Sequence, residues 1–233
     1  MRKLWGVFFL LKTLTQAQRI RAYDIAFPNS VSREGNSIHY IHNGRIIGYW
    51  IIGNLYKRNF YKNPGGYYGA YPHKFPERCY AQYPDCFRWL HLFSGTMRPT
   101  CSLESYLDPK AKLESQRAEI TFDLDPNLEP TICGDIRNFE TIPNLKEAVN
   151  ASDFILADPM YDKPDFEKHG QKSFSKTRVL QNLAKYIRPG AFLGWLDTRM
   201  PMFSSESWNN YSEIAVRVST NTRMRGFVVL RRK

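Results

Sequence analysis

Apolar runs recur along the second part of the chain, each bounded by polar or turn-forming residues. Their lengths are those of buried strands, and they predict strands at 88–93, 119–124, 131–134, 153–157, 191–196, 212–219 and 226–231. Segments with helical spacing lie between several of these runs, at 101–117, 139–150 and 175–187. The alternation indicates a mostly parallel sheet with helices on both faces, and the last two strands predict a closing hairpin at one edge.

The beginning of the chain has a different pattern. The stretch "SIHYIHNGRIIGYWII" places two β-rich runs around Asn43-Gly44, which is a favoured two-residue hairpin turn. The stretch "KNPGGYYGAYP" that follows indicates a loop, and a short helix is expected from Lys74 to about Tyr83. We therefore expect an N-terminal extension over 1–61 that contains a β-hairpin, followed by an α/β domain over 62–233 with a Rossmann-like sheet of seven strands.

The distribution of charge changes this picture more than its total does. Of 33 Lys and Arg and 22 Asp and Glu, 12 basic and 4 acidic residues lie in 1–87, and 6 basic and no acidic residues lie in 217–233. The middle of the chain therefore holds 15 basic and 18 acidic residues. Basic ends with interleaved tyrosines predict a polyanionic partner, nucleic acid first, although a solvated basic surface is the simpler alternative.

Neither a metal centre nor a membrane span is indicated by the sequence. The four cysteines lack the spacing of zinc ligands, and no histidine completes a set. The opening "MRKLWGVFFLLK" has a basic start and an apolar centre, but that centre is too short to cross a bilayer and no small-residue cleavage site follows. We expect a cytoplasmic protein without membrane attachment.

Candidate chemistry lies where the predicted strands end, because ligands of such sheets bind beyond the carboxyl ends of the strands. The first strand ends in "LFSGT", where Gly95 permits a tight turn close to a ligand. The second ends in "FDLD", which places Asp123 and Asp125 where an acid would accept both hydroxyls of a ribose. The third ends in "CGDI" with Asp135, and the fourth in "ADPMY" with Asp158. Each motif alone is also compatible with an ordinary turn.

Taken in this order, the four strand ends resemble those of class I S-adenosylmethionine-dependent methyltransferases. The chain is similar in particular to the amino-group methyltransferases of nucleic-acid bases, whose catalytic motif is Asp/Asn-Pro-Pro-Tyr/Phe/Trp. The segment "GYYGAYPHKF" resembles a cofactor-contacting segment that precedes the first motif in some of these enzymes. The stretches "RPGAFLGWLDTRMPMF" and "VSTNTRMRGFVVLRR" resemble phage and bacterial methyltransferases. The resemblance covers roughly residues 62–233.

The resemblance implies that the cofactor is S-adenosylmethionine, bound by the glycine-bearing turn and by the acids that follow it. The residues that it implies as cofactor contacts are Tyr68, Phe93, Ser94, Gly95, Thr96, Asp123, Leu124, Asp135, Ile136 and Asp158.

The resemblance also implies a mechanism for the fourth motif. An exocyclic amine is a poor nucleophile, because its lone pair is delocalised into the ring of the base. The family accepts hydrogen bonds from that amine, which localises the lone pair and positions the nitrogen for attack. Carried over, the Asp158 carboxylate and the Pro159 carbonyl would be the two acceptors, and Tyr161 would stack on the flipped-out base. No metal is required.

Met160 is the departure from the family pattern, because it stands where a second proline is usual. A proline would fix the backbone φ angle and so aim the carbonyl of the preceding residue. Methionine loosens this segment without removing either acceptor. Three readings stay open: an active site of lower activity, a cofactor-binding protein without turnover, and a simple strand exit.

The implied substrate is adenine N6 or cytosine N4 in DNA. Arg199 follows the predicted strand 191–196, and Arg223 and Arg225 lie between the last two strands, where phosphate contacts are expected. Methylation of RNA or of a small molecule is an alternative, and so is a non-catalytic nucleic-acid-binding module on the same fold.

Overall fold

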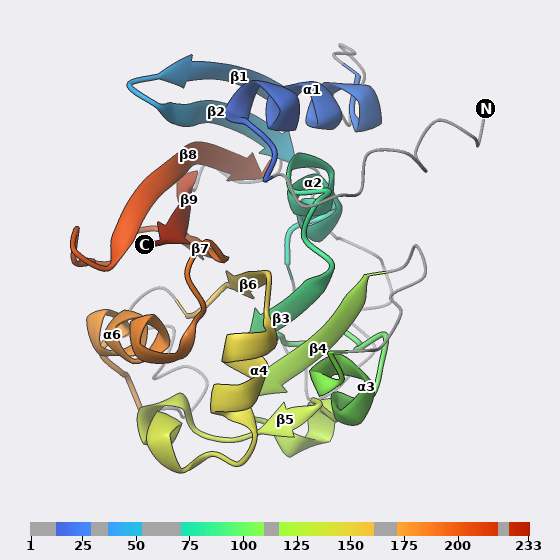
Figure 1. Cartoon of the computed structure of the whole chain (residues 1–233), viewed down its shortest axis with the longest axis vertical. Coiled ribbons are helices and arrows are strands. Elements are labelled where there is room, and N and C mark those ends of the chain that lie inside the picture. Colours follow the sequence, from blue (N-terminus) through green and yellow to red (C-terminus); the bar gives the residue numbers. More distant parts are fainter. Residues whose placement is uncertain (1–12, 29–36, 53–70, 110–116, 161–171, 219–223) are drawn as a thin grey trace.

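The protein is built on one mixed sheet of nine strands in the order β1-β2-β8-β9-β7-β6-β3-β4-β5. The computed structural model describes residues 13–28, 37–52, 71–109, 117–160, 172–218 and 224–233 (Figure 1). Five neighbouring strand pairs are parallel, and the pairs β1–β2, β7–β9 and β8–β9 are antiparallel. The bounds of the strands are β1 Ser37–His42, β2 Arg45–Ile52, β3 Arg88–Leu92, β4 Ala118–Asp123, β5 Ile132–Cys133, β6 Phe154–Ala157, β7 Phe192–Asp197, β8 Trp208–Val218 and β9 Met224–Arg232.

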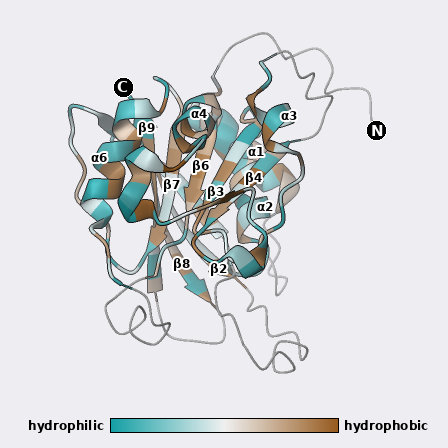
Figure 2. Ribbon diagram, turned by 90° about the horizontal axis from the view of Figure 1, so that it is seen from below, coloured by the Kyte–Doolittle hydropathy of each residue, from teal (hydrophilic) through white to brown (hydrophobic). Residues whose placement is uncertain are grey.

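Helices cover both faces of the sheet, as the alternating pattern predicts. Their bounds are α1 Gln16–Ala26, α2 Phe75–Gln82, α3 Leu103–Leu107, α4 Leu145–Ala151 and α6 Lys176–Tyr186, with 3-10 turns η2 Pro126–Leu128 and η3 Ile136–Thr141. The side chains of α1 and α2 join one buried cluster of apolar residues, and those of α3, α4 and α6 join another. Figure 2 shows the mainly hydrophobic strands between helices whose outer surfaces are hydrophilic. The sheet therefore has a core on each face.

The strand order β5-β4-β3-β6-β7 determines which edge of the sheet is expected to bind a ligand. It is the arrangement of a doubly wound sheet, in which the chain first adds strands on one side of β3 and then crosses to the other side. The switch in direction falls between β3 and β6, which are parallel neighbours. Ligands of such sheets bind outside the carboxyl ends of the strands at this point. The motifs that end β3, β4 and β6 are therefore brought together.

The predicted number of seven strands is wrong, because β1 and β2 join the same sheet. Strand β2 pairs in parallel with β8, from Ile46 opposite Ser212 to Ile52 opposite Val218. The closing pair β8–β9 is antiparallel as expected, but it does not lie at an edge. Strand β9 inserts between β7 and β8, and the N-terminal hairpin continues the sheet beyond β8. No sequence pattern specified this parallel pairing between segments far apart in the chain.

The hairpin itself is confirmed, and its turn has the expected backbone. Asn43 and Gly44 have φ angles of 46° and 70°, the left-handed values that a two-residue turn of this kind requires. Two of the three predicted helices have different bounds in the structure. The segment 139–150 is divided into η3 and α4, and Asn144 precedes α4 in the left-handed region with φ 61°. Only α3 is described within 101–117, because residues 110–116 lie outside the described part of the chain.

Candidate active site at the carboxyl ends of β3, β4 and β6

Two acids end the strands on either side of β3. Asp123 is the last residue of β4, and Asp158 follows directly after β6. In the register of the sheet, Leu92 of β3 lies opposite both Phe122 of β4 and Ala157 of β6. The next residue along each strand is Phe93, Asp123 or Asp158. The structure therefore brings the predicted ribose-type acid and the predicted catalytic acid to the same level of the sheet, with the turn after β3 between them.

The turn after β3 is tight and closely held. Phe93 and Gly95 have φ angles of 58° and 55°, and a positive φ is unusual for a phenylalanine. The Ser94 amide donates to the Phe122 carbonyl at 3.1 Å, and the Gly95 amide donates to the Asp123 carboxylate at 2.8 Å. Strained backbone of this kind is stored where the surroundings enforce it, commonly at functional sites. Gly95 thus turns the chain against Asp123, and Thr96 is exposed beside it.

Asp123 is 4% exposed, and the surrounding backbone amides satisfy much of its hydrogen-bonding capacity. Besides the bond from Gly95, its Oδ1 accepts from the Asp125 amide at 3.2 Å. Burial raises the pKa of the Asp123 carboxyl, while the amide hydrogen bonds of Gly95, Asp125 and Leu124 oppose this shift. The side chain of Leu124 next to it is 41% exposed. Asp123 is thus a rigidly placed acceptor below an accessible surface.

Asp135 lies beyond β5, and its carboxylate is occupied by a neighbouring arginine. The Arg137 guanidinium donates to both carboxylate oxygens, and the Arg137 amide donates to Oδ1 at 3.0 Å. These hydrogen bonds lower the pKa of the Asp135 carboxyl. The side chain of Ile136 is buried in the core, so a ligand at this position would meet its backbone. The implied contact of Asp135 with the cofactor stays a prediction.

The segment after β6 leaves the sheet at the same edge. Asp158 and Met160 are half-buried, and Pro159 is buried. Tyr161, the predicted stacking residue, lies outside the described residues, as does Tyr68 in the predicted cofactor-contacting segment. Tyr71, from the same segment, is described and buried, and its hydroxyl donates to the Leu156 carbonyl at 3.3 Å. Sequence reasoning selected Tyr68 and missed Tyr71, because nothing in a tyrosine-rich loop distinguishes one ring from another.

A set of aromatic and charged side chains lies beside this edge near β7. The rings of Phe93 and Phe174 stack with centroids 5.2 Å apart, and Trp195 meets the Phe93 ring edge-on at 6.3 Å. Asp197 ends β7 and is buried against the ammonium group of Lys176 and the indole N–H of Trp195. Sequence reasoning missed Phe174 and Lys176, because their approach to β3 and β7 depends on where α6 begins.

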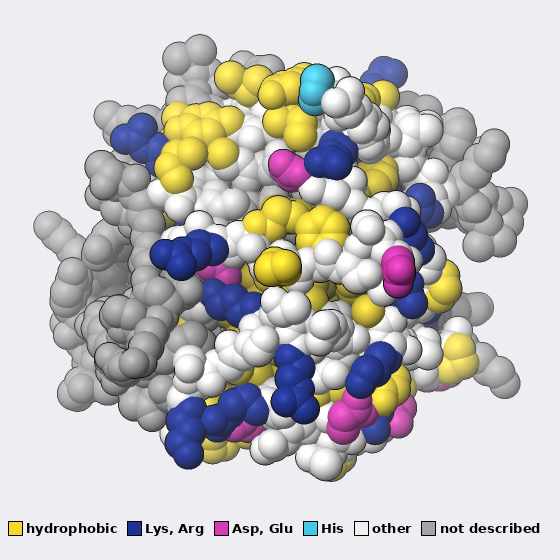
Figure 3. All heavy atoms as spheres, turned by 90° about the vertical axis from the view of Figure 1, so that its left-hand side faces the viewer, with side chains coloured by type: hydrophobic (Ala, Val, Ile, Leu, Met, Phe, Trp, Pro, Cys, Tyr) yellow, Lys and Arg dark blue, Asp and Glu magenta, His cyan; other side chains and the backbone are white. Residues whose placement is uncertain are grey.

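The predicted phosphate-binding arginines lie at the same edge as far as they are described. Arg199 is exposed just beyond β7, and Arg225 lies in β9 next to Gly226, which pairs with Asp197. Arg223 lies outside the described residues. On the face shown in Figure 3, the Lys and Arg side chains are spread from top to bottom with acidic side chains among them. The described residues on this face therefore form no single continuous basic patch.

One hollow lies apart from the acids at the ends of β4 and β6. A hollow of about 360 Å³ lies between η3 and α6, and its lining of mainly polar side chains includes none of the strand-end acids. Within the described residues, no group of three or more His, Cys, Asp or Glu side chains is arranged to hold a metal ion. The described helices include none with the length and apolar character needed to cross a membrane.

Comparisons with known proteins add little to this geometry. No family model matches the sequence, and no curated protein matches it either. Among solved structures, TrmN from Thermus thermophilus aligns with 63% of this chain and 44% of its own, at 16% identity and a TM-score of 0.39. A putative methyltransferase from Escherichia coli, YhhF, aligns with 84% of this chain and 99% of its own, at 12% identity and a TM-score of 0.37. The chain thus spans less than half of TrmN. The assignment of the fold rests on strand order and register.

Proposed function

We propose that the protein is an S-adenosylmethionine-dependent methyltransferase that acts on an exocyclic amino group of a nucleic-acid base, adenine N6 or cytosine N4, in DNA. One observation carries the proposal: Asp123 and Asp158 flank the glycine turn of β3 at the switch point of a doubly wound sheet. These are the positions that the sequence resemblance assigns to the ribose-binding acid and to the catalytic motif.

The residues around the β3 turn fit the proposed cofactor. Asp123 is a fixed carboxylate that can accept from ribose hydroxyls, and it lies next to the close backbone approach at Gly95. The Ser94 hydroxyl is buried and has no hydrogen-bond partner among the described residues. A buried polar group without a partner is rare in native proteins and is often explained by an unseen ligand or water. S-adenosylmethionine, when bound, supplies an electrophilic methyl group on a positively charged sulfur.

The segment after β6 would prepare the target amine. The Asp158 carboxylate and the Pro159 carbonyl accept hydrogen bonds from the amino group, which localises the nitrogen lone pair and fixes its direction. After transfer the amine must lose one proton, and the Asp158 carboxylate is the nearest proposed acceptor for it. Met160 follows this pair where a proline would stiffen the chain. The proposed site therefore keeps its acceptors and depends on its surroundings for rigidity.

The proposed substrate follows from charge and from the resemblance together. A net charge of +11, concentrated at the two ends of the chain, favours a polyanion. If phosphate contacts hold the substrate, binding must weaken steeply as salt rises. RNA is the alternative polymer, and a non-catalytic nucleic-acid-binding protein on this fold is the alternative function.

Two measurements test the proposal in sequence. Calorimetry with S-adenosylmethionine should give a Kd below about 1 mM, which corresponds to about 4 kcal/mol of binding free energy. Absence of binding at that level would contradict both the proposed cofactor and the proposed reaction. Transfer of labelled methyl groups to DNA then separates an enzyme from a binding module.

Variants of Asp158 give the matched comparison for transfer. Asp158→Ala should reduce transfer about 10²–10³-fold, the usual effect of removing one group that stabilises a transition state. Asp158→Asn keeps one oxygen acceptor and should retain more activity than Asp158→Ala. Equal label with wild type, Asp158→Asn and Asp158→Ala would exclude Asp158 from the mechanism.

A further inference from the structure

Four polar side chains are buried on the face of the sheet that α1 and α2 cover, next to the proposed site. They are Tyr71, which precedes α2, Tyr80 of α2, His91 of β3 and Glu119 of β4. His91 is 0% exposed and Glu119 is 6% exposed. Buried groups of this kind are unfavourable unless each finds a partner. A buried cluster of four such side chains therefore needs a reason.

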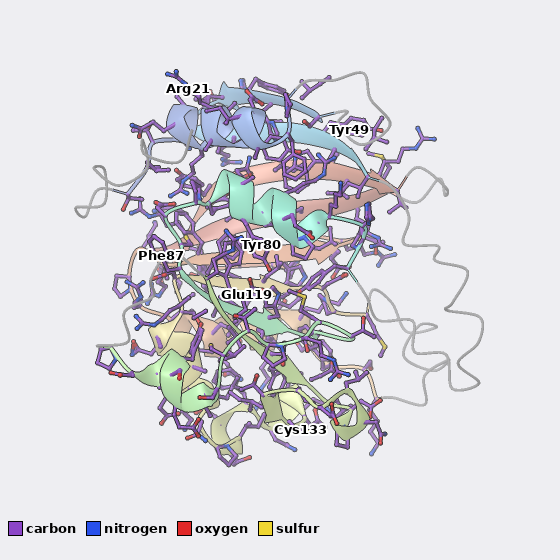
Figure 4. All side chains as sticks on the ribbon, turned by 90° about the vertical axis from the view of Figure 1, so that its right-hand side faces the viewer. Arg21, Tyr49, Tyr80, Phe87, Glu119 and Cys133 are labelled. Atoms are coloured by element: carbon purple, nitrogen blue, oxygen red, sulfur yellow. The ribbon has the colours of Figure 1, made fainter. Side chains whose placement is uncertain are left out.

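The four side chains form one connected network that ends on the backbone of β6. His91 Nε2 lies 3.3 Å from Glu119 Oε2, and the Tyr80 hydroxyl donates to that same oxygen at 2.7 Å. Figure 4 shows Tyr80 of α2 and Glu119 of β4 close together. At the other end, His91 Nδ1 lies 3.3 Å from the Tyr71 hydroxyl, which donates to the Leu156 carbonyl. Tyr71 is therefore the member that contacts the strand leading to Asp158.

Each member of the network has a partner, and the Tyr71 hydroxyl has two. A carbonyl can only accept, so the Tyr71 hydroxyl is the donor in its contact with Leu156. The same hydroxyl meets Nδ1 of His91, and Nε2 of that ring lies against the Glu119 carboxylate. Burial raises the pKa of Glu119, but the hydrogen bonds and charges of its neighbours, His91 first, hold it below the ordinary value. His91 and Glu119 thus hold the Tyr71 hydroxyl in place.

The register of the sheet connects this network with the proposed site. Leu156 lies opposite His91, and Asp158 comes two residues later, directly after the last residue of β6. Asp158 is thus two residues along the chain from the carbonyl that the Tyr71 hydroxyl contacts. Burial is the main cause that raises the pKa of the Tyr71 hydroxyl, and the charges of Asp158, Asp123 and Glu119 raise it further. The hydroxyl is thus within electrostatic reach of both strand-end acids.

We propose that Tyr71, held by His91 and Glu119, is a positioning residue that fixes the exit of β6 and thereby the direction of the Asp158 carboxylate. This inference rests on the proposed function. It answers the question raised by Met160, because a segment without the second proline needs another restraint. A carbonyl anchored two residues before Asp158 supplies one. Misplacement of a reacting group by about 1 Å can lower a rate about 10²-fold, so such a restraint can matter for turnover.

Tyr71→Phe tests the inference against a matched control, Tyr106→Phe. Tyr106 of α3 is also 0% exposed, and its hydroxyl makes one buried hydrogen bond, with Ser152 at 2.8 Å, in the cluster on the opposite face. Tyr71→Phe loses the contacts with Leu156 and His91, Tyr106→Phe loses the one with Ser152, and both variants keep the ring. Tyr71→Phe should lower kcat about 10–100-fold at nearly unchanged KM for S-adenosylmethionine, and Tyr106→Phe should leave kcat within about twofold. Equal kcat values for the two variants would overturn the inference.

A second readout needs no turnover and separates this inference from the proposed function. In nuclear magnetic resonance spectra, Tyr71→Phe should shift the Asp158 amide and carboxyl signals clearly more than Tyr106→Phe does. Unchanged Asp158 signals would exclude positioning even if the wild-type protein is an active methyltransferase. Shifted signals in a protein that transfers no methyl group would support the positioning of Asp158 while removing the proposed reaction.

Discussion

Two buried polar clusters lie on the same face of the sheet, next to α1 and α2, and they lead to different places. The Arg19 cluster consists of the Arg19 guanidinium of α1, the Asp85 carboxylate and the rings of Tyr83, Phe192 and Tyr211. The Tyr71 network consists of Tyr71, Tyr80, His91 and Glu119. The hydrogen bonds of the first cluster end within the scaffold. Those of the second end on the backbone that leads to Asp158.

The first cluster has the form of a structural anchor. Arg19 is 0% exposed, and its two terminal nitrogens donate to the two Asp85 oxygens at 2.6 and 2.7 Å. Its Nε donates to the Tyr211 hydroxyl at 3.2 Å, and its Cζ atom lies 4.7 Å from the centre of the Tyr83 ring. These contacts tie α1 to the sheet and to the segment after α2. Burial of polar groups is therefore no sign of function by itself. What distinguishes the clusters is where their hydrogen bonds end.

The largest expected effect separates the two clusters by stability. Arg19→Ala breaks the buried ion pair with Asp85, which keeps only the hydrogen bond from the Leu14 amide, and it should lower the free energy of unfolding by about 3–5 kcal/mol. Urea unfolding measures this change. At a temperature where the variant is folded, its kcat per folded molecule should equal that of wild type. A large fall in kcat for folded Arg19→Ala would contradict a purely structural role of the Arg19 cluster.

The next largest effect concerns cofactor binding by Asp123 at the β3 turn. Asp123→Asn keeps the shape of the side chain but removes the charge that would accept from ribose hydroxyls. A hydrogen bond to a charged group contributes about 1.5–3 kcal/mol, so the Kd for S-adenosylmethionine should rise about 10–100-fold. Glu213→Gln, at a half-buried acid of β8 that pairs with Arg45 of the hairpin, is the control and should change the Kd less than about threefold. Similar losses in both variants would argue against a specific role for Asp123.

A smaller effect on the scaffold should appear in acid. His39 of β1 accepts a hydrogen bond from the Trp50 indole at 2.7 Å, and burial, with the charge of Arg78 as a second cause, lowers its pKa to about 4. Because the unfolded state takes up the proton first, this contribution to stability is complete above about pH 6.5 and is lost as pH falls toward 4.

The same residue offers a direct test of that loss. His39→Gln keeps an acceptor but cannot take up the proton. Between pH 7 and 5, wild type should lose about 1–2 kcal/mol more stability than this variant, measured by urea unfolding. Parallel losses in the two proteins would show that folding does not lower the pKa of His39.

The smallest effect concerns the hairpin turn at the far end of the same scaffold. Gly44 has a φ of 70°, and a Cβ atom added there would meet nothing within 4 Å. Gly44→Ala should therefore lower stability by only about 1 kcal/mol, through the backbone conformation alone. Methyl transfer should not change. A loss several times larger in urea unfolding would mean that the turn makes contacts that the described residues do not account for.

Much of the scaffold follows from the sequence because its signals are local. Apolar runs and turn residues predict the strands β3 to β9 within a few residues, and Asn43-Gly44 predicts the hairpin. The parallel pairing of β2 with β8 does not follow, because it joins residues more than 150 positions apart through a register that no local pattern encodes. The count of seven strands was wrong for this reason.

The candidate site is predictable only in part. The acids at the ends of β4 and β6 follow from strand order, since parallel strands bring their carboxyl ends to one edge. The Tyr71 network does not follow, although the sequence contains a signal for it. His91 and Glu119 are polar residues next to apolar ones in predicted buried strands, and such positions indicate a buried partner. The identity of that partner depends on the packing of α2 and the segment before it.

Analysis of methylated nucleosides tests the central claim most directly. The wild-type protein is incubated with S-adenosylmethionine that carries a deuterated methyl group and with unmethylated DNA or RNA, and the digested nucleosides are identified by mass spectrometry. The proposal predicts deuterated N6-methyladenine or N4-methylcytosine from DNA, reduced at least about 10²-fold with Asp158→Ala. Label in RNA alone would show that the substrate is RNA and not DNA. Absence of a labelled base from both polymers, in a protein that binds the cofactor, would contradict the proposed function.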